Sequence, residues 1–249
     1  MSPFKWCTAG IIAATLLIGG CASAPESETT AKKPLGVILM FSEKEPESEV
    51  SSSRMLITDD FLRIDDGPGA EDYVIYDRRS RMIMNIVGED GTVLELPYRE
   101  VDVTLDEPLN WEKQEDTSNA LPRMTATGEN RAIHYKYKVN GHECYDVVAV
   151  KDMLPRALQA IREYRQSLAG VAQMPYQNGA DNADICDLAI NVMEPERVLR
   201  DGFPVREWGL GGYQRFLMDY QTGVDLPADL FKAPDDYRRY TPPIFETGS

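Results

Sequence analysis

The strongest constraint on the fold is a two-residue alternation in residues 71–97, EDYVIYDRRSRMIMNIVGEDGTVLELP. Met82, Met84 and Ile86 alternate there with the three residues that lie between and after them. Successive side chains of a strand point to opposite faces, so a period of two predicts strands rather than helices. The segments DRRS and GEDG interrupt the alternation with turn-forming residues. This stretch therefore predicts a meander of short antiparallel strands joined by hairpins.

Further strands are predicted on both sides of this meander. Residues 131–150 alternate again and contain Asn140-Gly141, the strongest short hairpin signal in the chain. The more polar residues 99–130 predict one strand around Val101–Leu105, followed by a long loop that carries Trp111. The other predicted strands are PLGVILMFSE, RMLITDD, FLRIDDGPG, FPVREW and YQRFLMDYQTG, the last two joined by a turn at GLGG.

One long helix is predicted after residue 151. Asp152 is placed to cap it, Pro155 suits its first turn, and Gly170 lies where a helix stop belongs. Its apolar stripe would consist of Leu154, Leu158, Ile161 and Leu168.

A second, shorter helix is expected from about Asn182 to Met193, with Cys186 on it. The segment VDLPADLFKAPDDY predicts an irregular closing cap, because its prolines and aspartates do not suit a central strand. Strands, then helices, then strands predict an α+β domain with a mainly antiparallel sheet and helices on one face.

Three segments of the chain resemble the superfamily of LolA, LolB and RseB, and most closely a group of exported domains of unknown function near it. They are YVIYDRRSRMIMNI, YKVNGHECYDVVAV and GFPVREWGLGGYQRFLMDY with its following cap. The resemblance implies a half-barrel over residues 35–244, that is, a curved sheet with the helical insert packed on its concave face. Several members of that superfamily bind acyl chains or lipoprotein segments in this cradle.

The alternating methionines suggest where such a ligand would lie. If Met82, Met84 and Ile86 line the concave face, they would suit a flexible apolar ligand, since methionine adapts to irregular surfaces. The other interpretation is an ordinary core beneath the helices, which uses the same alternation. No residue of this chain matches a ligand-contact motif of the superfamily.

The N-terminus predicts an export signal. Residues 1–20 carry one charge, at Lys5, and then run apolar to two glycines before Cys21. The run is too short for a comfortable membrane span, which needs about 20 apolar residues, and the pattern is typical of a secretory signal. Ile18-Gly19-Gly20-Cys21 resembles the lipobox of bacterial lipoproteins, which implies cleavage before Cys21 and acylation of its thiol. The alternative is an ordinary signal peptide with an incidental cysteine.

Residues 21–34 are polar and contain two prolines, which indicates a flexible tether. By the same resemblance, the absence of Asp directly after Cys21 favours the outer membrane, with the domain in the periplasm. A tethered cradle cannot shuttle between membranes, so a stationary receptor or a sensor is expected rather than a soluble carrier.

Two of the four cysteines are left for a disulfide. Cys7 would leave with the signal and Cys21 would carry lipid, so Cys144 and Cys186 form an even pair in an oxidising compartment. Their bridge would close a loop of about 43 residues, which contributes roughly 4 kcal/mol on the chain-entropy model. The alternatives are two buried free thiols or a metal site, although the Cys-x-x-Cys spacing of zinc sites is missing.

Charge and motifs exclude several classes of function. The net charge of −15 would become −16 after removal of residues 1–20, which argues against nucleic-acid binding and against docking on anionic lipid headgroups. The acyl chains would therefore do the anchoring. No nucleophile elbow, phosphate-binding glycine loop or zinc-protease helix occurs. We expect His134, His142 and acidic pairs such as Asp65-Asp66 to be solvated, with no cofactor and no metal.

The sequence thus predicts a membrane-anchored lipoprotein that does no chemistry. Its domain would bind a hydrophobic ligand, such as an acyl chain, a lipid or a lipoprotein segment, or an envelope protein. The alternative is a structural or interaction lipoprotein with a fully packed core and no small-molecule ligand.

Overall fold

The computed structural model describes residues 35–105, 107–116, 132–176 and 184–243. The chain divides into two units, Met1–Lys32 and Lys33–Ser249, and all described residues belong to the second. The predicted signal (1–20), the lipid-bearing Cys21 and the tether (21–34) therefore lie outside the described residues. Among the helices that are described, none is long and apolar enough to span a membrane.

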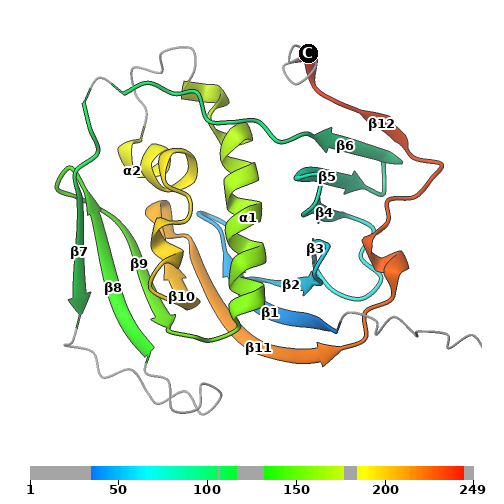
Figure 1. Cartoon of the computed structure of the whole chain (residues 1–249), viewed down its shortest axis with the longest axis horizontal. Coiled ribbons are helices and arrows are strands. Elements are labelled where there is room, and N and C mark those ends of the chain that lie inside the picture. Colours follow the sequence, from blue (N-terminus) through cyan, green and yellow to red (C-terminus); the bar gives the residue numbers. More distant parts are fainter. Residues whose placement is uncertain (1–34, 106, 117–131, 177–183, 244–249) are drawn as a thin grey trace, which may run out of the picture. The chain divides into compact units, whose positions relative to one another are not determined.

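The second unit is built on a curved, open and mostly antiparallel sheet, to which the described residues contribute twelve strands (Figure 1). The order in the sheet is β12-β6-β5-β4-β3-β2-β1-β11-β10-β9-β8-β7. With its helices, this sheet confirms the α+β class. The strands are β1 (Gly36–Lys44), β2 (Ser51–Ile57), β3 (Phe61–Asp65), β4 (Tyr73–Asp77), β5 (Met82–Val87), β6 (Thr92–Leu96), β7 (Trp111–Asp116), β8 (Ala132–Val139), β9 (His142–Val150), β10 (Phe203–Trp208), β11 (Gln214–Val224) and β12 (Arg238–Tyr240).

The meander predicted for residues 71–97 is confirmed, with antiparallel pairs joining β4 to β5 and β5 to β6. Asp77 Oδ1 holds the first turn by accepting hydrogen bonds from the backbone N–H groups of Arg79 (2.9 Å) and Ser80 (3.3 Å). The predicted Asn140-Gly141 hairpin between β8 and β9 is confirmed as well. Both of its turn residues have positive φ, 51° and 82°, as a tight hairpin turn of this kind requires.

The segment after β6 crosses the end of helix α1 (Pro155–Ala172) on its way to β7 (Figure 1). The prediction of a strand around Val101–Leu105 is wrong, because the backbone there bonds to the side chain of Gln173, the C-cap residue of α1, instead of to a strand. The Gln173 amide donates to the Glu100 carbonyl (2.9 Å) and accepts from the Asp102 N–H (2.7 Å). The predicted loop at Trp111 is also wrong, since Trp111 begins β7.

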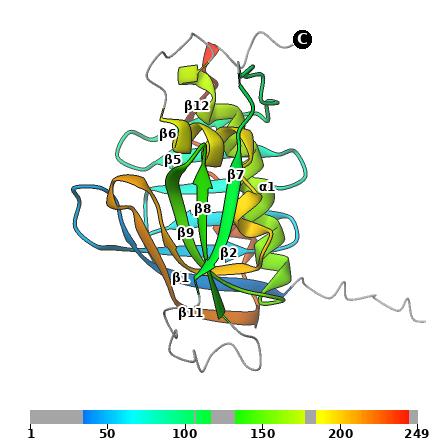
Figure 2. The same ribbon diagram turned by 90° about the vertical axis from the view of Figure 1, so that its left-hand side faces the viewer.

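Helix α1 lies in the bend of the sheet, with β7, β8 and β9 side by side on one side of it (Figures 1 and 2). Asp152 does not cap it, because Leu154 takes the N-cap position, with φ 46°. Gly170 does not end it either, since the helix continues to Ala172. A Cβ at Gly170 would lie 2.2 Å from the carbonyl oxygen of Arg99, so glycine here allows the crossing segment to approach.

The main core is formed by buried side chains of α1 and of the strands. Figure 1 shows α1 on the concave side of the sheet, where the half-barrel interpretation places the helical insert. Its buried side chains include Leu39, Phe41, Leu62, Tyr76, Ile83, Tyr137, Val147 and Phe203 from the strands, and Ala157, Leu158, Ala160 and Ile161 from α1. Burial of this apolar surface between the helix and the sheet is the main term that stabilises the fold.

A second, smaller core lies on the opposite face of the sheet. Its buried members are Ile75, Ile86, Val93 and Ala233, with Met84 packed against them. Because Ile83 points into the main core, the alternation of β5 turns Met84 and Ile86 the other way, and Met82 shares their face. The condition under which Met82, Met84 and Ile86 would suit a ligand on the concave face is therefore not met, because they lie on the opposite face.

The C-terminal segment covers this outer face, which confirms the predicted closing cap. It forms a short 3-10 helix at Ala228–Phe231, and the ring of Phe231 stacks on Phe61 with 5.6 Å between centroids. The chain then forms β12, which pairs with β6 in parallel.

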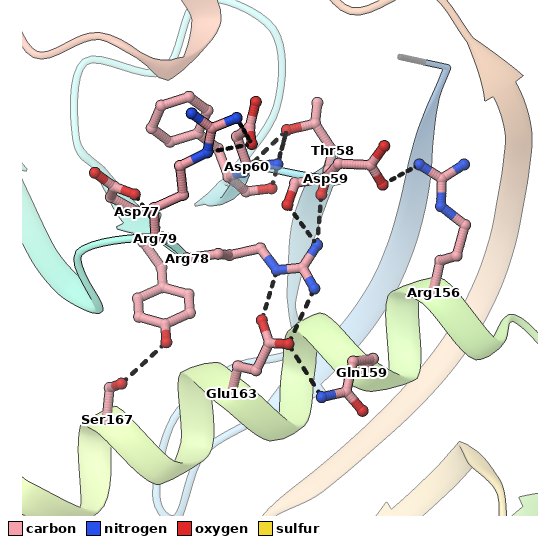
Figure 3. A network of polar contacts seen from close by, with 12 residues as sticks. Thr58, Asp59, Asp60, Asp77, Arg78, Arg79, Arg156, Gln159, Glu163 and Ser167 are labelled. Carbon is pink, nitrogen blue, oxygen red and sulfur yellow. Dashed lines mark hydrogen bonds and ion pairs between the residues drawn. The ribbon is translucent and has the colours of Figure 1, made fainter.

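Polar contacts tie α1 to two turns of the sheet (Figure 3). Glu163 on α1 accepts two hydrogen bonds from the Arg78 guanidinium, at 2.6 and 3.1 Å. The same guanidinium donates to the backbone carbonyls of Thr58 (2.8 Å) and Asp59 (3.1 Å). Arg78 thus joins three segments that are distant in the sequence: the helix, the turn between β2 and β3, and the turn between β4 and β5.

The adjacent residues Arg78 and Arg79 provide a test of these contacts. The Arg78 side chain is 14% exposed, whereas that of Arg79 is 79% exposed and pairs with Asp60 at the surface. We expect Arg78→Met to lower the free energy of unfolding by about 2–3 kcal/mol, because Glu163 loses its counter-ion and two carbonyls lose a donor. Arg79→Met should cost less than about 0.5 kcal/mol. Denaturant unfolding measures both, and equal losses would contradict the assignment.

Candidate functional site

A cleft of about 740 Å³ lies between the C-terminal half of α1, residues 185–195 and the strands below them. Its apolar lining comprises Pro46, Met55, Ile64, Ile161, Leu168, Val171, Ala172, Ile190 and Pro195. Its polar lining comprises Glu43, Glu45, Tyr145, Tyr164, Arg165, Asp187, Asn191, Tyr213 and Arg215. The helical insert therefore fills one part of the concave face and leaves another part open.

One wall of the cleft is the short helix α2 (Ile185–Asp187), which continues as a π-helical turn, Leu188–Met193. Asp184 caps α2 by accepting hydrogen bonds from the N–H groups of Cys186 (2.8 Å) and Asp187 (3.2 Å). The predicted end at Met193 is confirmed, whereas the predicted start at Asn182 lies outside the described residues.

A disulfide joins Cys144 on β9 to Cys186 on α2, with 5.1 Å between their Cα atoms, as predicted. Both cysteines line the cleft. The bridge spans a sequence separation of 42 residues and thereby attaches the wall to the sheet. By restricting the unfolded chain, it contributes about 4 kcal/mol at most.

A buried carboxylate lies beneath the cleft. Glu207 on β10 is 1% exposed, and its Oε1 accepts hydrogen bonds from the Tyr145 hydroxyl and from Arg165 Nη2, both at 2.7 Å. Its Oε2 lies 3.8 Å from Nη1 of Arg215. Side chains from β9, α1, β10 and β11 therefore meet at this carboxylate.

The protonation states in this cluster follow from burial and from the two arginines. Burial raises the pKa of the Glu207 carboxyl, but the charges of Arg165 and Arg215 and the bond from Tyr145 outweigh it, and the pKa lies below the ordinary 4.5. Burial also raises the pKa of Tyr145, and it raises that of Tyr213 to about 12. At neutral pH the site thus holds a carboxylate, two guanidinium ions and neutral phenols.

The residues predicted to contact a ligand are not in this cleft. Met82, Met84 and Ile86 are absent from its lining because they lie on the other face of the sheet. Cys144 and Cys186, predicted for a structural role, do line it.

The two histidines also lie outside the cleft lining. His142 is exposed, as predicted, but the prediction is wrong for His134, which is buried at 9% exposure. Its Nδ1 lies 3.6 Å from Asp116 and its Nε2 lies 3.4 Å from Asp146. Over the described ranges, no three or more His, Cys, Asp or Glu side chains are grouped so that they could hold a metal ion.

Asp65 is likewise buried rather than solvated. Its carboxylate accepts hydrogen bonds from Nε of Arg54 (2.8 Å) and Nε of Arg63 (2.6 Å). Arg63 also donates to the Leu230 carbonyl (2.7 Å), so this cluster fastens the closing cap to the sheet. Its partners are all internal, which gives it a structural role.

Sequence reasoning missed Arg165, Glu207 and Arg215, although two of them carry a signal. Glu207 and Arg215 stand two residues from Val205 and Leu217, on the apolar faces of their strands. A charged residue in such a position indicates a buried polar cluster, since charged side chains are almost never fully buried unless paired. No local pattern indicates that these residues meet, because they come from α1, β10 and β11.

Comparisons with known proteins identify no relative from which a function could be transferred. No protein-family model matches this chain. No curated protein matches it. Similar solved structures include an uncharacterized conserved protein from Thermus thermophilus, with a TM-score of 0.40 and 10% identity over 83% of this chain and 90% of that chain. Another is PNGF-II, with a TM-score of 0.38 and 8% identity over 85% of this chain and 32% of that chain. This chain thus spans about a third of PNGF-II, and similarities at this level establish neither a family nor a function.

Glu207→Gln tests the charged cluster. We expect it to lower the free energy of unfolding by about 3 kcal/mol near neutral pH, because two buried guanidinium ions lose their counter-ion. The folded-state pKa of Glu207 lies below 4.5, so the carboxylate stabilises the fold above that pH, and the effect is lost as the pH falls through the lower, folded-state value.

Denaturant unfolding of wild type and variant should therefore show a difference that shrinks below about pH 4.5. Glu112→Gln, at an exposed position of β7, is the matched control and should change little at any pH. A wild-type advantage that stays constant down to about pH 3 would contradict the assignment.

Proposed function

We propose that this chain is a lipoprotein anchored in the bacterial outer membrane through Cys21, whose periplasmic domain binds an apolar ligand in the cleft without chemistry. The observation that carries the ligand-binding part is the cleft itself. Its volume of about 740 Å³ lies within the range of small-molecule sites, about 300–1,000 Å³.

The composition of the cleft supports an apolar ligand. Leu168 from α1 and Ile190 from the wall line it, and Leu168 is 38% exposed. Transfer of an alkyl chain from water onto such a surface gains about 0.8 kcal/mol for each buried CH₂ group. The disulfide keeps the wall in place, so little ordering of the protein would oppose binding.

The anchoring part rests on the sequence. The lipobox-like Ile18-Gly19-Gly20-Cys21 and the polar residues 22–34 indicate a lipid anchor followed by a tether. The strongly acidic chain would not adhere to anionic lipid headgroups by charge, so acyl chains would supply the attachment. The resemblance to the superfamily of LolA, LolB and RseB agrees with a tethered binding domain.

The second candidate is an interaction lipoprotein without a small-molecule ligand. The observation in its favour is the packed core beneath α1, where Tyr76, Tyr137 and Phe203 are fully buried. In this case the cleft would be a water-filled gap, and partners would bind elsewhere on the domain.

Dye binding separates the two candidates. The full chain carrying Cys21→Ser would be purified without detergent and titrated with the neutral apolar dye Nile red. We expect saturable binding, weakened at least about tenfold by Leu168→Trp, which fills the cleft. Met218→Trp is the matched control, because Met218 is 68% exposed and is not part of the cleft lining. Absence of saturable binding, or equal effects of the two variants, would favour the second candidate.

Separation of membrane and soluble fractions tests the lipid anchor, and Cys7 in the signal segment provides the control position. We expect the wild-type chain in the membrane fraction and Cys21→Ser in the soluble fraction, because the acylated thiol is lost. Cys7→Ser should stay with the membrane, since Cys7 lies in the segment that is removed. Membrane retention of a Cys21→Ser chain whose mass shows that the signal has been removed would oppose lipid attachment at this residue.

A further inference from the structure

Arg215 is an arginine whose hydrogen-bonding capacity is largely unused. It lies on β11, it is 7% exposed, and it lines the cleft. Its guanidinium stacks on the Phe41 ring, with 3.8 Å from Cζ to the ring centroid. One face of the group is therefore covered by an aromatic ring of the main core.

The contacts of this guanidinium are weak for a buried cation. Nη2 donates to the thioether sulfur of Met55 at 3.4 Å, and sulfur is a poor acceptor. Nε lies 3.1 Å from Glu43 Oε1 but makes no hydrogen bond of acceptable geometry to any described residue. Nη1 lies 3.8 Å from Glu207, beyond hydrogen-bond reach. A guanidinium has five N–H donors, and burying them without oxygen acceptors costs free energy.

A second cation faces the same space. Arg165 lines the cleft from α1 and donates through Nη2 to Glu207, the carboxylate that it shares with Arg215. Two guanidinium ions thus converge on one fully buried carboxylate. The other carboxylate near Arg215 is that of Glu43, which is 23% exposed and already accepts a hydrogen bond from Ser53 (2.7 Å).

We propose that the ligand of this cleft is an organic acid whose carboxylate is bound by Arg215 and Arg165. Its apolar chain would lie between α1 and residues 185–195. This inference rests on the proposed function, since it assigns a ligand class to the same cleft. A carboxylate matches the planar donor edge of a guanidinium and would give Arg215 the oxygen acceptors that it lacks.

Acidic side chains in the cleft lining suggest a competing ligand class, one with a cationic head group. Glu45 is exposed at the rim, and Asp187 accepts hydrogen bonds from the Tyr176 hydroxyl and from Asn191 Nδ2. A ligand with an ammonium head would favour these groups and would avoid Arg215. Ligands of one chain length that differ in head group therefore distinguish the two.

The experiment is displacement of Nile red from the full chain carrying Cys21→Ser by dodecanoate, dodecanol and dodecylamine at neutral pH. We expect dodecanoate to displace the dye at a concentration about tenfold lower than dodecanol, the gain of charge-assisted hydrogen bonds over a neutral head. Arg215→Met should remove this preference and leave dodecanol unchanged. Arg215→Lys should keep part of it, because the charge stays while the paired donors are lost.

Arg206→Met is the matched control, because Arg206 also lies over a phenylalanine, Phe216, but is exposed and outside the cleft lining. It should leave the preference for dodecanoate intact. Equal displacement by acid and alcohol, a preference for the amine, or an acid preference that survives Arg215→Met would each overturn the inference while the apolar cleft stands. Failure of Nile red and of all three ligands to bind would instead overturn the proposed function. If Arg215→Met does not fold, the displacement of Nile red by dodecanoate and by dodecanol from the chain carrying only Cys21→Ser still decides between acid and alcohol.

Discussion

The pairing of β1 with β11 is the contact on which the rest of the domain depends. It joins the start of the described chain to its last long strand, from Gly36 opposite Val224 to Lys44 opposite Gln214. It unites two runs of neighbouring strands in one sheet, and its register places Glu43 directly opposite Arg215. Because side chains alternate between faces, a slip of one residue would turn Arg215 out of the cleft and Phe216 into it. The floor of the cleft is therefore a consequence of this register.

Helix α1 depends on both halves of that sheet and connects them. Glu163 binds Arg78 from the meander, and two residues later Arg165 binds Glu207 from the second half. The cleft lies on the side of the helix where the facing wall is attached by a disulfide. The position of α1 between the two halves of the sheet thus has two results. Its first part packs tightly on the strands, and its second part borders the open cleft.

The parts of the fold that local patterns predicted correctly are those whose cause is local. The turn after Asp77 and the Asn140-Gly141 hairpin need only nearby residues, and both are present. The predictions for Gly170 and Val101–Leu105 failed because a distant segment intervened: the backbone of residues 99–102 crosses the helix end and bonds to Gln173. The placement of Met84 and Ile86 on the concave face failed for a different reason. Alternation separates two faces, but both faces of this sheet are covered, so an apolar pattern could not identify the concave one.

The sequence by itself determined the strands of the meander and of the Asn140-Gly141 hairpin, and the pairing of Cys144 with Cys186, because each follows from alternation, turn chemistry or the number of available cysteines. It also carries the lipobox-like motif, which lies outside the described residues. Only the tertiary structure decided which face of each strand meets α1, and that Arg165, Glu207 and Arg215 converge beneath a cleft. The physical reason is that a buried charge cluster forms only between elements that a long-range register brings together, and no local sequence pattern encodes that register.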